Sequence, residues 1–388
     1  MFAAMSLTLE IIFWSSAGLI GYGYVFYALI LAGLRRVFPP APPSFTNELP
    51  SISVLIAAYN EEQAIKDRIA NCLTLDYPKD KLEIIIASDG SNDRTNEIAA
   101  TFDRDPVRLI CLKQRQGKVN AINTAAPKAK NEILIFSDAT SHFEPDLARK
   151  LVRHFGDTQV GCVCGNVVFT NAAGSKTGEL EGAYWKLETY LRQREGERGS
   201  TLGATGAAFA MRRELWRPCP PNALVEDLVM PMKVLQSGYQ VNFEPEAIAT
   251  ETAAEKIDEE FERRRRIGAG ALQSLILLLP MLNPLRGFPA IAFFSHKVIR
   301  WLTPMLMILC LLTHLILAIN SGLYLSLLVP HLGFYLAALI GLLVGRKNRV
   351  YRVLSLPYYF VSMNTALLCG YFKYLRGTQK VTWNRVNR

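Results

Sequence analysis

Long apolar runs lie toward both ends of the chain, and a stretch of mixed apolar and charged residues separates them. Residues 11–34 form one such run, longer than the roughly 20 residues that a helix needs to cross the core of a bilayer. It has neither a basic leader nor a clear small-residue cleavage site, so we expect residues 1–38 to be a retained transmembrane anchor. Four prolines then predict a stiff, extended linker over residues 39–49.

The apolar runs after residue 300 predict membrane-spanning helices at about 301–319, 323–344 and 353–372. These helices make residues 301–375 a membrane-embedded region. The run at 271–282 is too short to span, and prolines interrupt the sequence that follows it. We therefore expect residues 269–300 to form interfacial helices, with a basic tail at 376–388.

Residues 50–268 read as a soluble α/β domain. Buried-strand patterns occur at residues 51–58, 82–88 and 132–136, and helical patterns alternate with them. This alternation predicts a mostly parallel sheet covered by helices on both faces. Polar side chains directly past the ends of such strands line the ligand crevice, and Asn60, Asp89 and Asp138 fall at those positions.

The net charge of +9 does not indicate a nucleic-acid partner, because the basic residues flank apolar segments instead of forming a face with interleaved aromatics. This distribution is typical of a protein bound to membrane lipids with its basic loops in the cytoplasm. Arg35 and Arg36 predict that residues 50–268 are cytoplasmic and that the amino terminus is outside. Seven scattered cysteines without CxxC spacing agree with a reducing compartment.

Three full spans after the soluble domain would place the basic tail outside, against the positive-inside bias. We therefore expect that one late apolar segment does not fully cross, most naturally the one containing Pro357 and Asn364. In that topology Arg388 is cytoplasmic.

Several polar residues suit the binding and cleavage of a sugar nucleotide. Lys118 can neutralise phosphate as a point charge, and Asp138 suits a metal ion or a diphosphate. Asp89 suits the base or ribose, and the pair Glu226-Asp227 could supply a general base. Each also has an ordinary structural interpretation, because an Asp after a strand often caps a helix and Glu-Asp pairs usually lie on solvated faces.

The order of these residues is more specific than any one of them. The motifs are Ala58-Tyr59-Asn60-Glu61-Glu62, Ser88-Asp89-Gly90-Ser91-Asn92-Asp93, Gly117-Lys118-Val119-Asn120, Phe136-Ser137-Asp138-Ala139, Gly203-Ala204-Thr205-Gly206, Glu226-Asp227 and Phe261-Glu262-Arg263-Arg264-Arg265-Arg266. The series resembles the family-two glycosyltransferases, especially the processive branch of cellulose, chitin, hyaluronan and poly-N-acetylglucosamine synthases. The resemblance extends from about residue 50 to residue 268.

The resemblance implies an A-type glycosyltransferase fold, inverting transfer, a divalent cation (Mg²⁺ or Mn²⁺) and a nucleotide-sugar donor, usually linked to uridine diphosphate. By the family pattern the donor would be bound by Tyr59, Glu61, Asp89, Lys118 and Asp138. Asp138 would also be the metal ligand, and Asp227 would be the general base. The acceptor or the diphosphate would contact Gly206, Glu226, Arg263, Arg266 and Trp383.

Two positions depart from the family pattern. The Asp-x-Asp motif reads Asp138-Ala139-Thr140, so its second carboxylate is absent and the second protein contact of the metal is undefined. The Gln-x-x-Arg-Trp signature reads Arg263-Arg264-Arg265-Arg266-Ile267, which keeps the arginine but lacks the tryptophan. The adjacent arginines also fit a surface anchor for anionic lipid, and Trp383 also fits an interfacial anchor.

Two enzymatic hypotheses follow, both placed in the cytoplasmic membrane of a bacterium. The first is a synthase that extends a polysaccharide and passes it through its own membrane helices. The alternative is a transferase that adds a single sugar to a lipid-linked acceptor. A transporter is disfavoured, because an ion pathway needs more charge within the membrane than His296, Lys297, Arg300 and His314 provide.

Overall fold

One eight-stranded sheet forms the centre of the catalytic domain. The computed structural model describes residues 2–170, 176–252, 257–344 and 349–379. Within them the strands follow the order β3-β2-β1-β4-β7-β6-β8-β5. Their bounds are β1 Ile52–Ala58, β2 Leu82–Ser88, β3 Val107–Cys111, β4 Ile133–Asp138, β5 His142–Phe143, β6 Val160–Thr170, β7 Phe209–Arg212 and β8 Gln240–Thr252. β1 pairs in parallel with β2 and β4, and β2 pairs in parallel with β3, so the predicted parallel half is confirmed.

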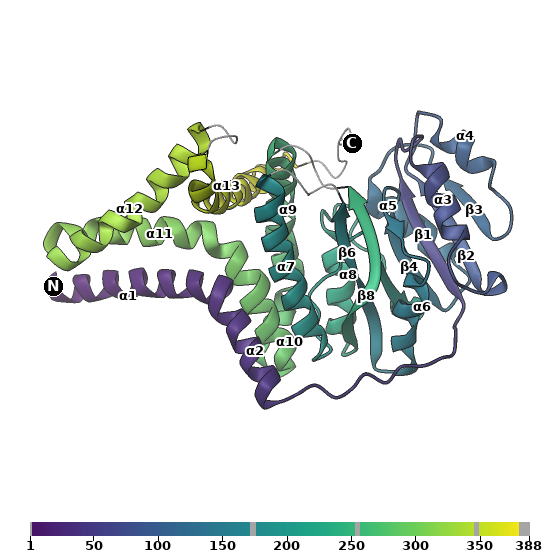
Figure 1. Ribbon diagram of the computed structural model, residues 1–388, viewed down its shortest axis with the longest axis horizontal. Coiled ribbons are helices and arrows are strands. Elements are labelled where there is room, and N and C mark those ends of the chain that lie inside the picture. The colour runs from purple at the N-terminus through teal and green to yellow at the C-terminus, as the bar shows by residue number, and fades with distance from the viewer. Residues whose placement is uncertain (1, 171–175, 253–256, 345–348, 380–388) are drawn as a thin grey trace.

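Helices cover both faces of this sheet, as Figure 1 shows. The helices of the catalytic domain are α3 Ile65–Leu73, α4 Thr95–Ala100, α5 Lys118–Ala125, α6 Leu147–Val152 and α8 Glu226–Gln236. Alternate residues of β1 enter two different hydrophobic clusters: Leu55 belongs to one, and Val54 and Ile56 belong to the other. A strand buried on both faces needs a continuous apolar sequence, which explains the pattern at residues 52–58.

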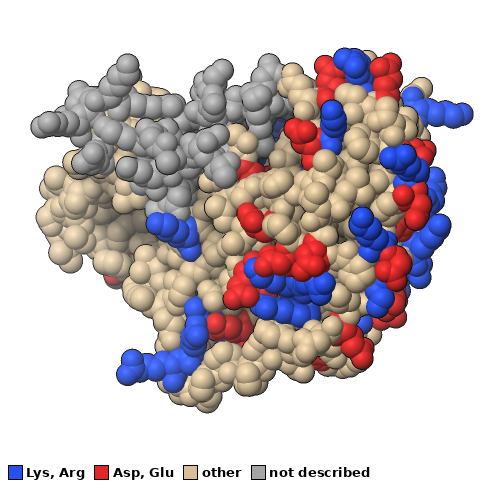
Figure 2. Space-filling view, turned by 45° about the vertical axis from the view of Figure 1, so that its right-hand side comes forward, with Lys and Arg blue, Asp and Glu red and all other residues tan. Residues whose placement is uncertain are grey.

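Four helical segments are long and apolar enough to cross a membrane among the described residues, and they indicate an integral membrane protein. They cover Ser6–Val37, Phe288–Asn320, Gly322–Leu343 and Val353–Leu375. The first segment comprises α1 Phe2–Gly21, the π-helical turn η1 Tyr22–Phe26 and α2 Tyr27–Val37. The second comprises α10 Phe288–Ala292, the π-helical turn η8 Phe293–Val298 and α11 Ile299–Asn320. The third is α12 Gly322–Leu343, and the fourth lies within α13 Arg349–Leu375. In Figure 2 charged side chains gather over the catalytic domain, whereas the described surface of the membrane helices is largely uncharged.

The second membrane helix begins earlier than the sequence suggested. It starts at Phe288, inside the segment 269–300 that was expected at the membrane surface. Pro289 does not break this helix, because it lies in the first turn, where its missing N–H has no helical partner to lose. Two short 3₁₀ turns, Leu279–Leu282 and Pro284–Arg286, connect it to the preceding helix.

Two long helices, α7 Lys176–Gly196 and α9 Ile257–Leu277, stand between the sheet and the membrane helices (Figure 1). α9 packs along α13 at a glycine crossing. A Cβ atom at Gly268 would collide with the carbonyl oxygen of Leu367, and one at Gly370 would collide with that of Arg265. The last membrane helix is therefore in direct backbone contact with a helix that continues from the catalytic domain.

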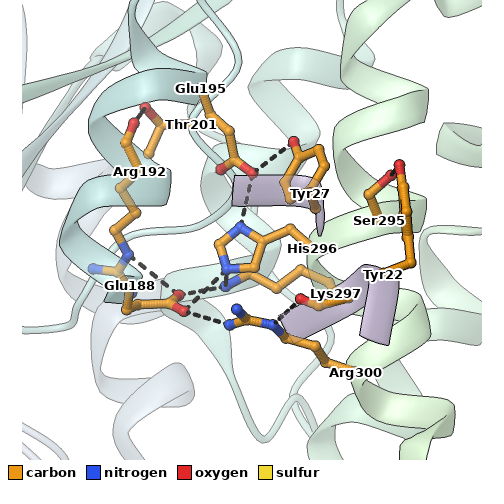
Figure 3. Close-up of polar contacts among 11 residues, drawn as sticks. Tyr22, Tyr27, Glu188, Arg192, Glu195, Thr201, Ser295, His296, Lys297 and Arg300 are labelled. Carbon is orange, nitrogen blue, oxygen red and sulfur yellow. Dashed lines mark hydrogen bonds and ion pairs between the residues drawn. The ribbon is translucent and has the colours of Figure 1, made fainter. Parts of the chain in front are cut away.

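A buried ionic cluster fixes α7 to the membrane helices (Figure 3). Glu188 of α7 lies 3.0 Å from Nε2 of His296, 2.6 Å from Nζ of Lys297 and 3.3 Å from Nη1 of Arg300. Nδ1 of His296 lies 2.8 Å from Glu195 Oε1, which also accepts a hydrogen bond from the Tyr27 hydroxyl. Both π-helical turns contribute to this contact, since η8 carries His296 and Lys297, and the carbonyl oxygen of Gly23 in η1 accepts a hydrogen bond from Nε of Arg300 at 3.0 Å. Single π-helical turns inside α-helices are frequent at functional sites.

Candidate active site

The loops after β1 and β2 form one edge of the candidate site. The strands are parallel, so their carboxyl ends meet, and Asn60 exchanges two hydrogen bonds with Asn92: its Nδ2 donates to Asn92 Oδ1 at 2.6 Å, and the Asn92 N–H donates to Asn60 Oδ1 at 2.9 Å. Asn60 has a φ of 54°, which Asn tolerates better than most residues. The Glu61 N–H donates to Thr95 Oγ1 at 2.7 Å, and the Tyr59 ring lies beneath the Arg115 guanidinium, 3.8 Å from the ring centroid.

Asp89 directs its carboxylate at the backbone of the next loop. It is 1% exposed, and its oxygens accept hydrogen bonds from the N–H groups of Gln116 at 2.7 Å and Gly117 at 2.8 Å. Burial raises the pKa of Asp89, and these two N–H groups oppose the increase. Asp89 thus shapes the loop that leads into α5, in addition to any contact with a nucleotide.

Lys118, the first residue of α5, is held between two carboxylates. Its Nζ lies 2.5 Å from Asp138 Oδ1, at the end of β4, and 2.7 Å from Glu226 Oε1, at the start of α8. Burial alone would lower the pKa of Lys118, but the carboxylates of Asp138, Glu226 and Asp227 raise it above the usual value. The lysine therefore carries a permanent positive charge at this point.

Asp227 faces the glycine turn at residues 203–206. Its Oδ2 accepts a hydrogen bond from the Gly206 N–H at 3.2 Å, and its backbone carbonyl accepts one from Ala204 at 2.8 Å. Burial, followed by the neighbouring charge of Glu226, raises the pKa of Asp227 to about 6. A carboxylate with this pKa is ionised at neutral pH and accepts a proton more readily than an ordinary aspartate.

The structure brings together Lys118, Asp138, Gly206, Glu226 and Asp227 from four separate segments. Two predicted acceptor-side residues, Arg263 and Arg266, lie on α9 outside these contacts. The Arg263 guanidinium lies 5.6 Å from the ring of Trp185 on α7, and Arg266 is exposed. Trp383 lies outside the described residues.

Arg68, under the site, was not identified from the sequence. It is 3% exposed, and its Nη2 donates to Ser137 Oγ at 2.8 Å, directly before Asp138. Its Nη1 donates to Asn71 Oδ1 at 2.5 Å. The signal was present in the sequence, since Arg68 lies on the helix face made by Ile65, Ile69 and Cys72, and a charged residue in an apolar stripe needs a buried partner.

The residues present fit a divalent cation that also binds a diphosphate. Among the described residues no three His, Cys, Asp or Glu side chains are grouped as a protein-only metal site would require. Asp138 and Glu226 nevertheless share one cation, the Lys118 ammonium. Mg²⁺ and similar hard cations are commonly held by one or two carboxylates together with substrate phosphates, so this pair is sufficient.

A mostly parallel sheet with carboxylates and a lysine gathered past its strand ends, joined to membrane helices, is the arrangement expected of an A-type glycosyltransferase fold. Residues 53–217 match the family model for glycosyl transferase family 2. This part of the chain therefore has the sequence features of that family, and the chain is similar to poly-β-1,6-N-acetyl-D-glucosamine synthases.

Two curated relatives illustrate this similarity. The probable glycosyltransferase YdaM of Bacillus subtilis is 31% identical over 237 residues, which cover 58% of this chain and 56% of that protein. The poly-β-1,6-N-acetyl-D-glucosamine synthase of Staphylococcus epidermidis is 25% identical over 280 residues, 70% of this chain and 67% of that protein. The matched part thus spans only 56% of the length of the first of these relatives.

One solved structure matches nearly the whole chain. The mannosyltransferase PcManGT of Pyrobaculum calidifontis, in complex with GDP-Man and Mn²⁺, covers 98% of this chain and 100% of its own, with a TM-score of 0.70 and 20% identity. At this level of identity the match shows a common fold, including the membrane helices. The family match covers residues 53–217, and the fold match covers nearly the whole chain.

Proposed function

We propose that this chain transfers a sugar from a uridine-diphosphate donor to a growing polysaccharide, with inversion at the anomeric carbon and with export coupled through the membrane helices. The observation that carries the proposal is Asp227, a largely buried carboxylate with a pKa of about 6 beside the ion-paired group of Lys118 and Asp138. The similarity to synthases named for a polysaccharide product supports this choice of acceptor.

In the proposed reaction Asp227 accepts the proton of the acceptor hydroxyl as that oxygen attacks the anomeric carbon. Attack from the side opposite the departing diphosphate inverts the configuration, because the enzyme uses a base and needs no covalent intermediate. Lys118 stabilises the negative charge that develops on the diphosphate. A divalent cation held by Asp138 would supply further charge there when bound.

Donor binding is proposed to use the loops after β1 and β2. Tyr59 and Glu61 lie in the first loop, whose conformation is fixed by Asn60 and Thr95. Asp89 holds the loop that presents Lys118, so replacing Asp89 would disturb both nucleoside and phosphate contacts. Arg115 over the Tyr59 ring closes this side of the crevice.

A second candidate is the addition of one sugar to a lipid-linked acceptor. A cavity of about 160 Å³ between α11, α12 and α13 favours it. The cavity is lined mainly by apolar side chains, among them Met307, Leu311 and Leu368, and it could receive part of a hydrocarbon chain.

Product length separates the two candidates. Purified protein in detergent is incubated with each of a panel of radiolabelled uridine-diphosphate sugars. Release of the nucleotide identifies the donor, and the length of the labelled product is then measured with that donor. A ladder or a polymer then supports the synthase, whereas a single added sugar on an extractable lipid supports the second candidate. Asp227→Asn provides the matched inactive control.

A further inference from the structure

The Asp-x-Asp position leaves the candidate cation site one carboxylate short. Asp138 is present, but Thr140 takes the place of the second acid and its side chain is exposed. A threonine hydroxyl is a weak ligand for a hard cation in comparison with a carboxylate. Another residue must therefore provide the missing negative charge if a divalent cation is to be held without the donor.

Glu226 lies where such a ligand is required. Lys118 Nζ contacts Asp138 Oδ1 at 2.5 Å and Glu226 Oε1 at 2.7 Å, so the two carboxylates already converge on one cation. Glu226 is 8% exposed, and it comes from α8, far from Asp138 in the sequence. Burying a carboxylate is costly unless it is paired, which explains why the lysine lies against it.

The glycine turn keeps the space around this cation open. A Cβ atom added at Gly206 would lie 2.6 Å from Lys118 Nζ and 3.1 Å from Asp138 Oδ2. Any side chain at residue 206 would therefore occupy the region next to the point where the carboxylates converge. The Gly206 N–H instead holds Asp227, which keeps that carboxylate directed at the turn.

Lys118 is the ion-pair partner of both Asp138 and Glu226. Lysine is a point charge on a flexible stem, so it can move to donor phosphates without refolding of α5.

We propose that Glu226 and Asp138 together form the divalent-cation site of this enzyme, and that the Lys118 ammonium occupies that site in the donor-free protein. Entry of the metal displaces Lys118, which then reaches the diphosphate of the donor. The proposal rests on the proposed function for the use of the site, but the cation site itself can be measured without any sugar.

The test measures direct binding of Mn²⁺ to the full-length protein in detergent. Binding is measured from the electron paramagnetic resonance signal of free Mn²⁺. No donor is present. Glu226→Gln should weaken binding by about tenfold or more, because it removes one of two ligand charges. Thr140→Ala, the matched control, should bind as wild type does. Lys118→Met should bind Mn²⁺ more tightly than wild type, since the competing ammonium is gone.

The Lys118→Met result is the most informative, because a purely structural role for the lysine predicts weaker binding. Unchanged or weaker Mn²⁺ binding in Lys118→Met overturns the proposal that the metal displaces the Lys118 ammonium. Wild-type binding in Glu226→Gln overturns Glu226 as a ligand. Glu226→Asp, which keeps the charge, covers the case in which Glu226→Gln does not fold, and it should bind Mn²⁺ more tightly than Glu226→Ala.

Failure of the proposed function gives a different result. Wild-type protein that binds Mn²⁺ through Glu226 but releases no nucleotide from any uridine-diphosphate sugar contradicts the function and leaves the cation site intact. Protein that turns over donor equally well in Glu226→Gln, with unchanged Mn²⁺ binding, contradicts the cation site and leaves the function intact.

Discussion

Asp227 combines two properties that a catalytic base requires: it is ionised at neutral pH, and it lies next to the turn beside the proposed acceptor position. We expect Asp227→Asn to reduce turnover by roughly 100- to 10,000-fold, the usual effect of losing a general base. The donor should still bind, because the side-chain amide retains the Gly206 contact and the nucleotide loops lie elsewhere. Turnover and nucleotide affinity are measured on the same mutant. Loss of both together would assign Asp227 to the donor site.

The raised pKa of Asp227 also predicts how activity depends on pH. A base works only when deprotonated, so the rate should fall as the pH drops through about 6, well above the usual aspartate range. For stability the sign is opposite, because a carboxyl whose pKa is raised by folding binds protons more tightly when folded. Its contribution is favourable below the unfolded pKa and is lost as the pH rises through 6. Asp227→Asn should therefore melt at a higher temperature than wild type at pH 7.5. Equal melting temperatures of mutant and wild type at both pH 4 and pH 7.5 would contradict this assignment.

The single residues of the site were predictable to different degrees. The position of Asp89 directly after β2 and that of Asp138 at the end of β4 were predictable from the buried-strand patterns, and Lys118 and Asp227 were proposed from their motifs. The pairing of Glu226 with Lys118 could not be found, because it depends on how α8 approaches the end of β4. The backbone contacts of Asp89 depend in the same way on the path of the loop after β3.

At the scale of elements, the strands that are buried on both faces were the easiest to predict. β1, β2 and β4 are short and almost wholly apolar, and no amphipathic helix has that pattern. The position of α7 in the fold was harder to predict, because this helix has no continuous apolar stripe. The buried residues Glu188, Arg192 and Glu195 are charged. Those charges make sense only beside the membrane helices, a contact between segments about a hundred residues apart.

The ionic cluster of α7 should be essential for docking the catalytic domain on the membrane helices. Burial alone would raise the pKa of Glu188, but its interactions with His296 and Lys297 hold that pKa well below its usual value. Glu188→Gln leaves the cations of Lys297 and Arg300 without their shared carboxylate. Such a loss costs about 3–5 kcal/mol, so the melting temperature in detergent should fall by several degrees.

Glu97→Gln is the matched control for this substitution. Glu97 forms an exposed ion pair with Arg94 at 3.8 Å, and pairs of that kind contribute about 0–1 kcal/mol. Melting should therefore be almost unchanged. Equal stability of wild type, Glu188→Gln and Glu97→Gln would show that the cluster does not hold the two parts together.

For the whole molecule, the division into a catalytic domain and membrane helices was readable from the sequence, because a lipid environment requires long runs without charge. The start of the second membrane helix was not, because Pro284 and Pro289 suggested an interruption. The packing of α13 on α9 was also hidden: it depends on Gly268 and Gly370 facing each other, and two isolated glycines carry no such signal.

That packing bears on the side of the membrane at which the chain ends. α9 continues from β8 of the catalytic domain, and its residues Arg265 and Gly268 contact α13 at Gly370 and Leu367. The carboxyl-terminal end of α13 is therefore on the side of the catalytic domain, and from the positive-inside rule we expect this side to be the cytoplasm. We expect a cysteine placed at Arg388, in a chain otherwise without cysteine, to react with an impermeant thiol reagent only after the cells are opened. Restoring the exposed Cys111 of β3 marks the cytoplasmic side, and Ser321→Cys, in the turn between α11 and α12, should react in intact cells. Reaction at residue 388 in intact cells would mean that α13 crosses fully and that its contact with α9 forms within the membrane.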